Sequence, residues 1–308
     1  MSTLHAAADD YLAMRRALGY QLRQEGRMLT SFVDHLERHG STRITIEAAL
    51  AWATEPEHAD PTWWAKRLTV VRGFAGYLRA WDGLTEVPPT RLLSKGVRRR
   101  TPYLYSPAQI LALMGAARRL ASPLRAATFE TFIGLMAATG LRTGEAMGLD
   151  RDDVHLDDSL LIVRRSKFDK SRQVPLHQTT TDALADYARR RDDLCPHPAV
   201  PCFFLSGAGT RLNHTNVSTT FAGLLAAAGV AAPRGRRRPR PYDLRHSFAV
   251  ATLVAWYADD APVPARLPAL STYLGHVKPS STYWYLESSP ELMAAAASRL
   301  ERFWQESS

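Results

Sequence analysis

The sequence predicts a mainly α-helical protein with one small β-hairpin or sheet, divided into two domains. Most of the chain has apolar residues at helical spacing, and several of these segments end on glycine. Only 158–166 and 171–177 are typical of strands. A stretch rich in proline and arginine, 85–105, interrupts the apolar pattern and marks the division between the domains.

The first domain, 1–85, is predicted to be a unit of four helices. They are expected at 4–19, 22–40, 45–55 and 61–83. Gly19 and Gly40 can end the first two, because glycine readily adopts the left-handed conformation that closes a helix. We interpret the aromatic residues of the fourth segment as core rather than as groups that stack on bases: Trp63, Trp64, Phe74, Tyr77 and Trp81.

The segment that follows, 86–105, has the composition of a basic linker. It contains Pro88, Pro89 and Pro102 and has no apolar periodicity. Its arginine run 98–100 either lies along a phosphate backbone or belongs to a solvated tether, and both interpretations stay open.

The second domain, 106–308, is predicted to consist of helices around one hairpin. Ser106 and Pro107 are suited to the N-cap and the first position of a helix. The two strands would form a hairpin with Lys167 and Lys170 at its tip. Helices are expected at 106–120, 126–140, 180–194, 213–229, 243–258, 267–276 and 289–306.

The charge of the chain favours a polyanionic partner. Its 308 residues carry a net charge of +9, and the sequence pI is about 9.8. A positive charge of this size favours nucleic acid over a membrane surface as the partner. The alternative is a basic but otherwise ordinary soluble protein. Lysine occurs only at positions 66, 95, 167, 170 and 278, so the pair at the hairpin tip stands out among arginines.

Several classes of protein are not favoured by the sequence. Cys195 and Cys202 offer no disulfide framework, and the short Cys/His cluster around them lacks the paired spacing of a zinc site, so no metal is expected. Asp9 and Asp10 stand where a signal peptide needs an apolar run, and 131–141 is too short to span a bilayer. We therefore expect a cytoplasmic protein without membrane association.

Four separated stretches supply cationic or proton-carrying groups. The first, "TGLRTGE", contains Arg142, and Glu145 lies one helical turn later, close enough to pair with it. The other three contribute Lys167 at the hairpin tip, Arg245 in "YDLRHSF" and His276 in "LGH".

Two tyrosines, Tyr283 and Tyr285, follow the last of these stretches. Two positions on a helix correspond to about 200°, so the two side chains would face nearly opposite sides. At most one of them can therefore enter a given site.

The order and spacing of these stretches resemble the tyrosine recombinase (phage integrase) family over roughly residues 100–290. The resemblance implies a helical core-binding (SAM-like) domain at 1–85 and an α+β catalytic domain at 106–308, closing as a C-shape around DNA. It also implies catalytic roles for five residues, with the nucleophile nine positions after the histidine: Arg142, Lys167, Arg245, His276 and Tyr285.

These residue types fit the implied chemistry. Attack of a tyrosine on a phosphodiester increases the negative charge on the phosphoryl oxygens, which two arginines and a histidine can stabilise. A lysine can protonate the leaving 5′-oxygen. Because a phosphotyrosine intermediate conserves the bond energy, the resemblance implies strand breakage and rejoining without metal, ATP or another cofactor.

One position departs from the family pattern. The second box usually reads His-x-x-Arg, and Tyr242 stands at the position of that histidine. A phenol can donate a hydrogen bond to phosphate but is a poor base at neutral pH, so we expect slower or differently gated cleavage, tested by restoring histidine at 242.

Two further residues have alternative interpretations. His246 is either a substitute for the missing histidine or a structural histidine; we favour the structural role, because on a helix it points about 100° away from Arg245. Lys170 is a rival to Lys167, which the family pattern favours.

Further basic residues are candidates for contacts with the DNA backbone. Arg165 and Arg172, on the predicted strands, are either such contacts or solvated strand residues, and a low-complexity basic segment precedes Tyr242. The candidates are Arg98, Arg99, Arg100, Arg165, Lys170, Arg172, Arg236, Arg237 and Arg238.

The resemblance also implies partners. These are double-stranded DNA with recombination sites, a Holliday-junction intermediate, and a homo-tetramer on DNA in a nucleoid-associated setting. The segment 289–308 carries an apolar stripe and either docks onto a neighbouring protomer or packs within its own chain.

The biological role could be integration of a mobile element, transposition or dimer resolution. The alternatives are a catalytically weak DNA-binding regulator of the same fold, which Tyr242 favours, and a type IB topoisomerase-like enzyme that relaxes DNA.

Overall fold

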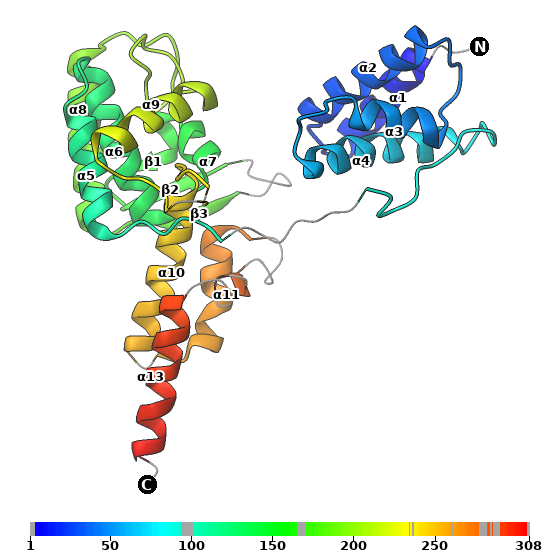
Figure 1. The fold of residues 1–308 in the computed structure, drawn as a ribbon. Helices are drawn as coiled ribbons and strands as arrows, with labels where there is room; N and C mark the ends of the chain where they lie inside the picture. Colours follow the sequence, from blue (N-terminus) through cyan, green and yellow to red (C-terminus); the bar gives the residue numbers. More distant parts are fainter. Residues whose placement is uncertain are drawn as a thin grey trace. The chain divides into compact units, whose positions relative to one another are not determined.

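The computed structural model describes residues 4–93, 101–164, 171–233, 235, 237–259, 261–276, 282–283, 285 and 290–306. The chain divides into two compact units, Met1–Arg100 and Thr101–Ser308 (Figure 1). The division falls within the stretch that we expected to be a basic linker. The described residues are mostly helical with one small antiparallel sheet, which confirms the expected fold class.

The described part of the first unit, 4–93, contains four helices packed around an apolar core. They are α1 Leu4–Ala17, α2 Arg23–Arg38, α3 Ile46–Thr54 and α4 Pro61–Leu78. Phe32, Trp52 and Phe74 are fully buried in this core, as expected for Phe74. Trp81 follows the last helix and is 67% exposed, so the core interpretation was wrong for this residue.

The second unit contains the other elements of the described residues. Its helices are α5 Pro107–Arg118, α6 Pro123–Thr139, α7 Thr143–Gly148, the 3₁₀ helix η1 Arg151–Asp153, α8 Gln178–Leu194, α9 His214–Ala227, α10 Asp243–Ala258, α11 Val263–Leu274 and α13 Pro290–Glu306. Ser106 caps α5 by accepting a hydrogen bond from Gln109 N, and Pro107 is its first residue, as expected. Helix α6 has buried residues on every face, which is typical of a central helix.

The sheet has three antiparallel strands in the order β1–β2–β3, namely Val154–His155, Leu160–Val163 and Arg172–Pro175. Strands β2 and β3 form the expected hairpin, with Leu161 opposite Val174 and Val163 opposite Arg172. Leu161, Val163 and Val174 are buried, so this pairing fixes which face of the hairpin meets the core. The hairpin tip, with Lys167 and Lys170, lies outside the described residues.

Helix α10 joins the parts of the second unit that build the site. It contacts α6, α11 and α13, and α10, α11 and α13 lie side by side in Figure 1. The apolar cluster shared by these helices includes Leu253, Leu270, Tyr285 and Leu292.

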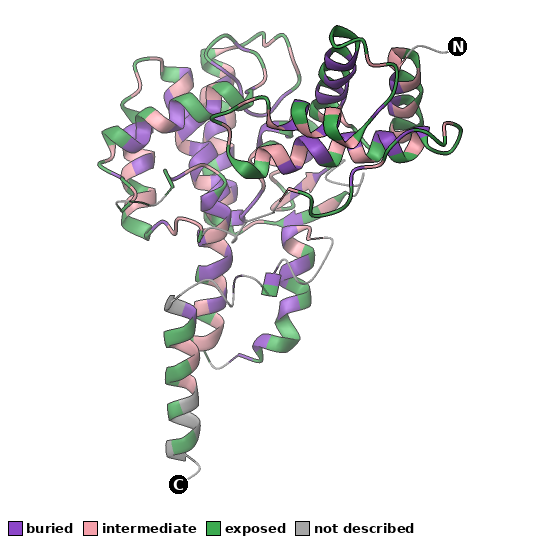
Figure 2. Cartoon of the chain, turned by 45° about the vertical axis from the view of Figure 1, so that its right-hand side comes forward, coloured by how far each residue is buried: buried purple, intermediate pink, exposed green. Residues whose placement is uncertain are grey.

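Helix α13 therefore packs within its own chain through Leu292, and Figure 2 shows exposed residues along this helix. Among them, Met293 and Trp304 are 64% and 61% exposed. No helix among the described residues is both long and apolar enough to cross a membrane.

Candidate active site

The candidate active site lies where the C-terminal ends of two helices come close together. Helices α6 and α11 end at Gly140 and Gly275, which adopt φ values of +62° and +68°. This left-handed conformation suits glycine because it has no Cβ. The last carbonyl groups of a helix carry partial negative charge and lack partners within the helix, so they attract cationic side chains.

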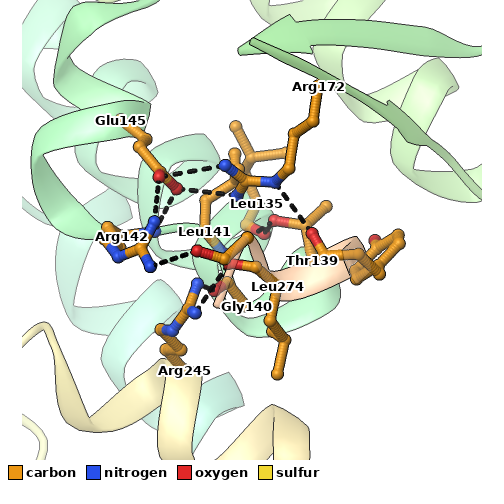
Figure 3. Close-up of polar contacts among 11 residues, drawn as sticks. Leu135, Thr139, Gly140, Leu141, Arg142, Glu145, Arg172, Arg245 and Leu274 are labelled. Atoms are coloured by element: carbon orange, nitrogen blue, oxygen red, sulfur yellow. Dashed lines mark hydrogen bonds and ion pairs between the residues drawn. The ribbon is translucent and has the colours of Figure 1, made fainter. Parts of the chain in front are cut away.

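Arg245 binds both of these helix ends (Figure 3). It lies in the first turn of α10, and its side chain is fully buried. Its Nη1 donates to Gly140 O at 2.8 Å and its Nη2 to Leu274 O at 2.7 Å. Burial lowers the pKa of the Arg245 guanidinium, but an arginine remains charged at neutral pH. Arg245 therefore holds a fixed positive charge where α6, α10 and α11 meet.

Arg142 lies beside it and is held by two partners. Its Nη1 donates to Glu145 Oε1, as expected from the sequence, and its Nη2 donates to Gly275 O at 2.6 Å. The backbone N of Arg142 also donates to Glu145 Oε2 at 3.0 Å, so the carboxylate caps the start of α7. The side chain of Arg142 keeps 23% exposure, which leaves part of the guanidinium accessible.

Arg172, on β3, completes the cluster and corrects one of our expectations. Its Nη1 and Nη2 donate to the two oxygens of Glu145 at 3.0 and 2.8 Å, and its Nε donates to Tyr273 O at 2.8 Å. Its side chain is only 11% exposed, so Arg172 is not a solvated strand residue. We assign it to the positioning of Glu145 rather than to the DNA backbone, because three of its N–H groups are bonded within the protein.

Glu145 is buried between these two arginines. Burial alone would raise the pKa of its carboxyl, but the hydrogen bond and charge of Arg172, followed by those of Arg142, outweigh burial and lower this pKa to about 2. The carboxylate is thus ionised at neutral pH. Three arginine charges minus one carboxylate charge leave +2 on these four side chains, which suits a phosphodiester that gains charge on attack.

His276 follows Gly275 and contributes a neutral imidazole. Burial, and then the charges of Arg245, Arg142 and Arg172, lower its pKa to about 3. Its Nδ1 lies 2.7 Å from Thr282 Oγ1, and Thr282 is 1% exposed. Sequence reasoning did not identify Thr282, whose only indication was its place between "LGH" and the tyrosines. This contact fixes the orientation of the ring.

Tyr285 and Tyr283 face different surroundings, as helical geometry predicted. Tyr285 is 2% exposed, whereas Tyr283 is 50% exposed. The Tyr285 ring stacks on His276 at 6.0 Å between centroids and meets His246 edge-on at 5.4 Å. Burial raises the pKa of Tyr285, and the charge of Arg245 opposes this shift.

Tyr242 stands at the start of α10 and is 36% exposed. Its ring meets that of His246 at 5.0 Å between centroids, with an interplanar angle of 76°. The structure thus places His246 between Tyr242 and Tyr285, closer to the site than we expected for a structural histidine.

The remaining candidates fall into two groups. Arg237 and Arg238 are exposed on the segment that leads to α10, and Arg238 Nη2 donates to Ala222 O at 3.0 Å. The others lie outside the described residues: Arg98, Arg99, Arg100, Arg165, Lys167, Lys170 and Arg236.

Gly275→Ala should destabilise the protein. A Cβ at this position would lie 2.7 Å from Arg172 Nη1, on a backbone at φ +68°. We expect a loss of about 1–3 kcal/mol in the free energy of unfolding, measured by chemical denaturation. Gly223→Ala on α9 is the matched control, because a Cβ there meets nothing within 4 Å. Equal effects of the two substitutions would contradict the tight packing of Arg172 on Gly275.

Comparison with known proteins identifies the chain. The family model described as the phage integrase family matches residues 105–291. The chain belongs to the phage integrase family. Within this family it is 43% identical over 312 residues to the protein y4rB of Sinorhizobium fredii, named as an integrase/recombinase, with 99% of each chain covered. It is 29% identical over 266 residues to the tyrosine recombinase XerC of Mycobacterium leprae, covering 83% of this chain and 84% of that protein.

The fold is also shared with solved structures of integrases. The integrase of transposon Tn1549, in complex with a circular intermediate DNA, superposes with a TM-score of 0.68 at 17% identity, covering 96% of this chain and 99% of that one. The family model and the relative at 43% identity confirm the family resemblance inferred from the sequence.

Proposed function

We propose that this integrase-family chain is a site-specific DNA recombinase that cleaves and rejoins strands through a 3′-phosphotyrosine at Tyr285. The observation that carries the proposal is the position of Tyr285, whose ring contacts His276 and whose pKa responds to the charge of Arg245. Family membership and relatives named as recombinases support it and do not favour the regulator or topoisomerase alternatives.

In this proposal each group of the site has one task. Arg142 and Arg245 stabilise the charge that develops on the phosphoryl oxygens, and their fixed positions mean that little reorganisation is needed during the reaction. Neutral His276, oriented by Thr282, donates a hydrogen bond to the same oxygens. Glu145 and Arg172 are positioning residues, since they act through Arg142.

The leaving 5′-oxygen also needs a proton. We propose Lys167 as its donor on the basis of the family pattern, with Lys170 as the rival. Protonation at this step would release a 5′-hydroxyl, which can later attack the phosphotyrosine and restore the strand.

The contacts with DNA are proposed from charge. Exposed Arg237 and Arg238 precede the helix that holds Arg245, so they would bind phosphates next to the scissile one. The proposed backbone contacts elsewhere are Arg98, Arg99, Arg100, Arg165, Lys170 and Arg236. Binding of this kind to chromosomal DNA would associate the protein with the nucleoid.

The proposed function can be tested without knowing the target sequence. Nicked duplexes with a randomised segment are incubated with the full chain, and species that survive denaturation as covalent protein–DNA adducts are recovered and sequenced. We expect enrichment of one duplex sequence, called here the selected duplex. Reversible binding without any covalent adduct would favour the regulator. Relaxation of supercoiled plasmid without recombinant products would favour the topoisomerase-like enzyme.

We also propose a homo-tetramer on DNA that exchanges strands through a Holliday junction, with 289–308 contributing to assembly. Exposed Met293 and Trp304 on α13 support this, because they leave apolar surface available to another protomer. Deleting 289–308 should abolish assembly of the tetramer on the selected duplex, as measured by light scattering. Since Leu292 packs within the chain, Trp304→Ser is the milder variant. If both variants assemble like the intact chain, docking between protomers is wrong.

A further inference from the structure

None of the tasks assigned so far to the residues of this site is acceptance of the proton of Tyr285. Nucleophilic attack by a phenol requires loss of its proton, and Tyr242 occupies the position where the family pattern places a histidine. A second phenol is a poor proton acceptor at neutral pH. Another group beside Tyr285 is therefore better suited to accept this proton.

Helix geometry places His246 on the same face as position 242. The two residues are four positions apart, so their side chains lie one above the other on α10. The sequence-based preference for a structural role considered only the angle between His246 and Arg245, one position away. The relevant spacing is to Tyr242, and the ring contact at 5.0 Å between centroids shows that the two side chains meet.

His246 also contacts the nucleophile. Its ring meets the Tyr285 ring at 5.4 Å between centroids with an interplanar angle of 62°. His246 is half-buried, whereas Tyr285 is almost fully buried and Tyr242 is exposed. An imidazole thus lies between the buried tyrosine and the exposed start of α10.

The other imidazole at Tyr285 is unsuited to this task. His276 lies among the charges of Arg245, Arg142 and Arg172, which together with burial lower its pKa to about 3. A proton transferred to His276 would add a fourth positive charge to that group. His276 is thus suited to donate a hydrogen bond to phosphate rather than to accept a proton.

We propose that His246 is the general base for Tyr285 and replaces, one helical turn later, the histidine that position 242 lacks. As the bond from Tyr285 Oη to phosphorus forms, the Oη proton passes to a ring nitrogen of His246. The bond from phosphorus to the 5′-oxygen breaks, and this oxygen takes a proton from the proposed donor Lys167. On rejoining, the 5′-hydroxyl attacks phosphorus and returns its proton to Lys167, the bond from phosphorus to Oη breaks, and His246 returns its proton to Tyr285. This inference rests on the proposed recombinase function.

The test measures single-turnover adduct formation on the selected duplex. His246→Gln and His246→Ala should each slow cleavage by roughly 10²-fold, the usual contribution of a general base, with unchanged DNA affinity and melting temperature. Added imidazole should restore part of the rate of His246→Ala, which a purely structural role cannot explain. His197→Gln, an exposed histidine in the same unit, is the matched control and should cleave normally.

Tyr242→His supplies a second readout. The new imidazole would stand one turn before His246 on the same face, so Tyr242→His should cleave faster than the natural chain. In the Tyr242→His background, His246→Gln should lower the cleavage rate by less than about tenfold, because the histidine at position 242 can take over as the base.

The outcomes separate the two levels of the proposal. If the natural chain forms no adduct, both the proposed function and this inference fail. If it forms the adduct and His246→Gln is equally fast, only the general base is wrong. The general-base role would also be overturned if the His246 variants cleaved more slowly, had a lowered melting temperature and were not rescued by imidazole, since His246 would then be structural.

Discussion

Tyr285→Phe should abolish the covalent adduct, lowering cleavage by on the order of 10⁴-fold or more, as expected when a nucleophile is removed. Phenylalanine keeps the ring that packs with Leu270 and Leu292, so the fold and the DNA affinity should be preserved. Denaturing electrophoresis of the selected duplex with bound protein measures the adduct directly.

Tyr283→Phe is the matched control for this prediction. Tyr283 lies two positions away and is 50% exposed, so loss of its hydroxyl should leave adduct formation within about twofold of the natural chain. An adduct that persists in Tyr285→Phe and disappears in Tyr283→Phe would show that the wrong tyrosine has been assigned.

Glu145→Gln should lower both stability and cleavage. The carboxylate is bound by Arg142 and Arg172, and its side chain is 7% exposed. Removing one partner of a buried ion pair leaves charge uncompensated, so we expect a loss of about 3 kcal/mol in the free energy of unfolding. Cleavage should fall by roughly 10²-fold because Arg142 loses its orientation. Glu130→Gln is the control, because Glu130 pairs with Arg118, whose side chain is 61% exposed. This substitution should lower the free energy of unfolding by less than about 1 kcal/mol.

The pH dependence of stability provides an independent check on Glu145. Its pKa is lowered from 4.5 to about 2 in the folded protein, so it binds protons less readily than in the unfolded chain. The stability that this shift contributes, about 3 kcal/mol, is fully present above pH 4.5 and is lost as the pH falls towards 2. Glu145→Gln should lack this part of the acid dependence. An unchanged acid profile would contradict the buried ion pair.

Local patterns in the sequence predicted much of the fold. Most of the helices, the cap at Ser106 and the β2–β3 hairpin follow from apolar periodicity, capping residues and strand composition, which act over a few residues. The short elements α7, η1 and β1 were not predicted, and α11 begins at Val263 rather than at 267. The pair Arg142–Glu145 was also predictable, because its members are three positions apart.

The missed features depend on residues that are distant in sequence. Arg172 reaches Glu145 across 27 positions and lies against Gly275, which no local pattern indicates. Trp81 appears apolar in sequence but falls after the end of α4, where no partner helix covers it in the described part of its unit. The proposed role of His246 depends on its ring contact with Tyr285, which comes from a separate segment.

The most direct test of the central claim is identification of the residue that carries the DNA. The adduct formed on the selected duplex is digested with nuclease and protease, and the modified peptide is sequenced by mass spectrometry. We expect a nucleotide joined through its 3′-phosphate to Tyr285, with a free 5′-hydroxyl on the released strand. A nucleotide attached to Tyr283 or to any other residue, or one joined through its 5′-phosphate, would contradict the proposed mechanism.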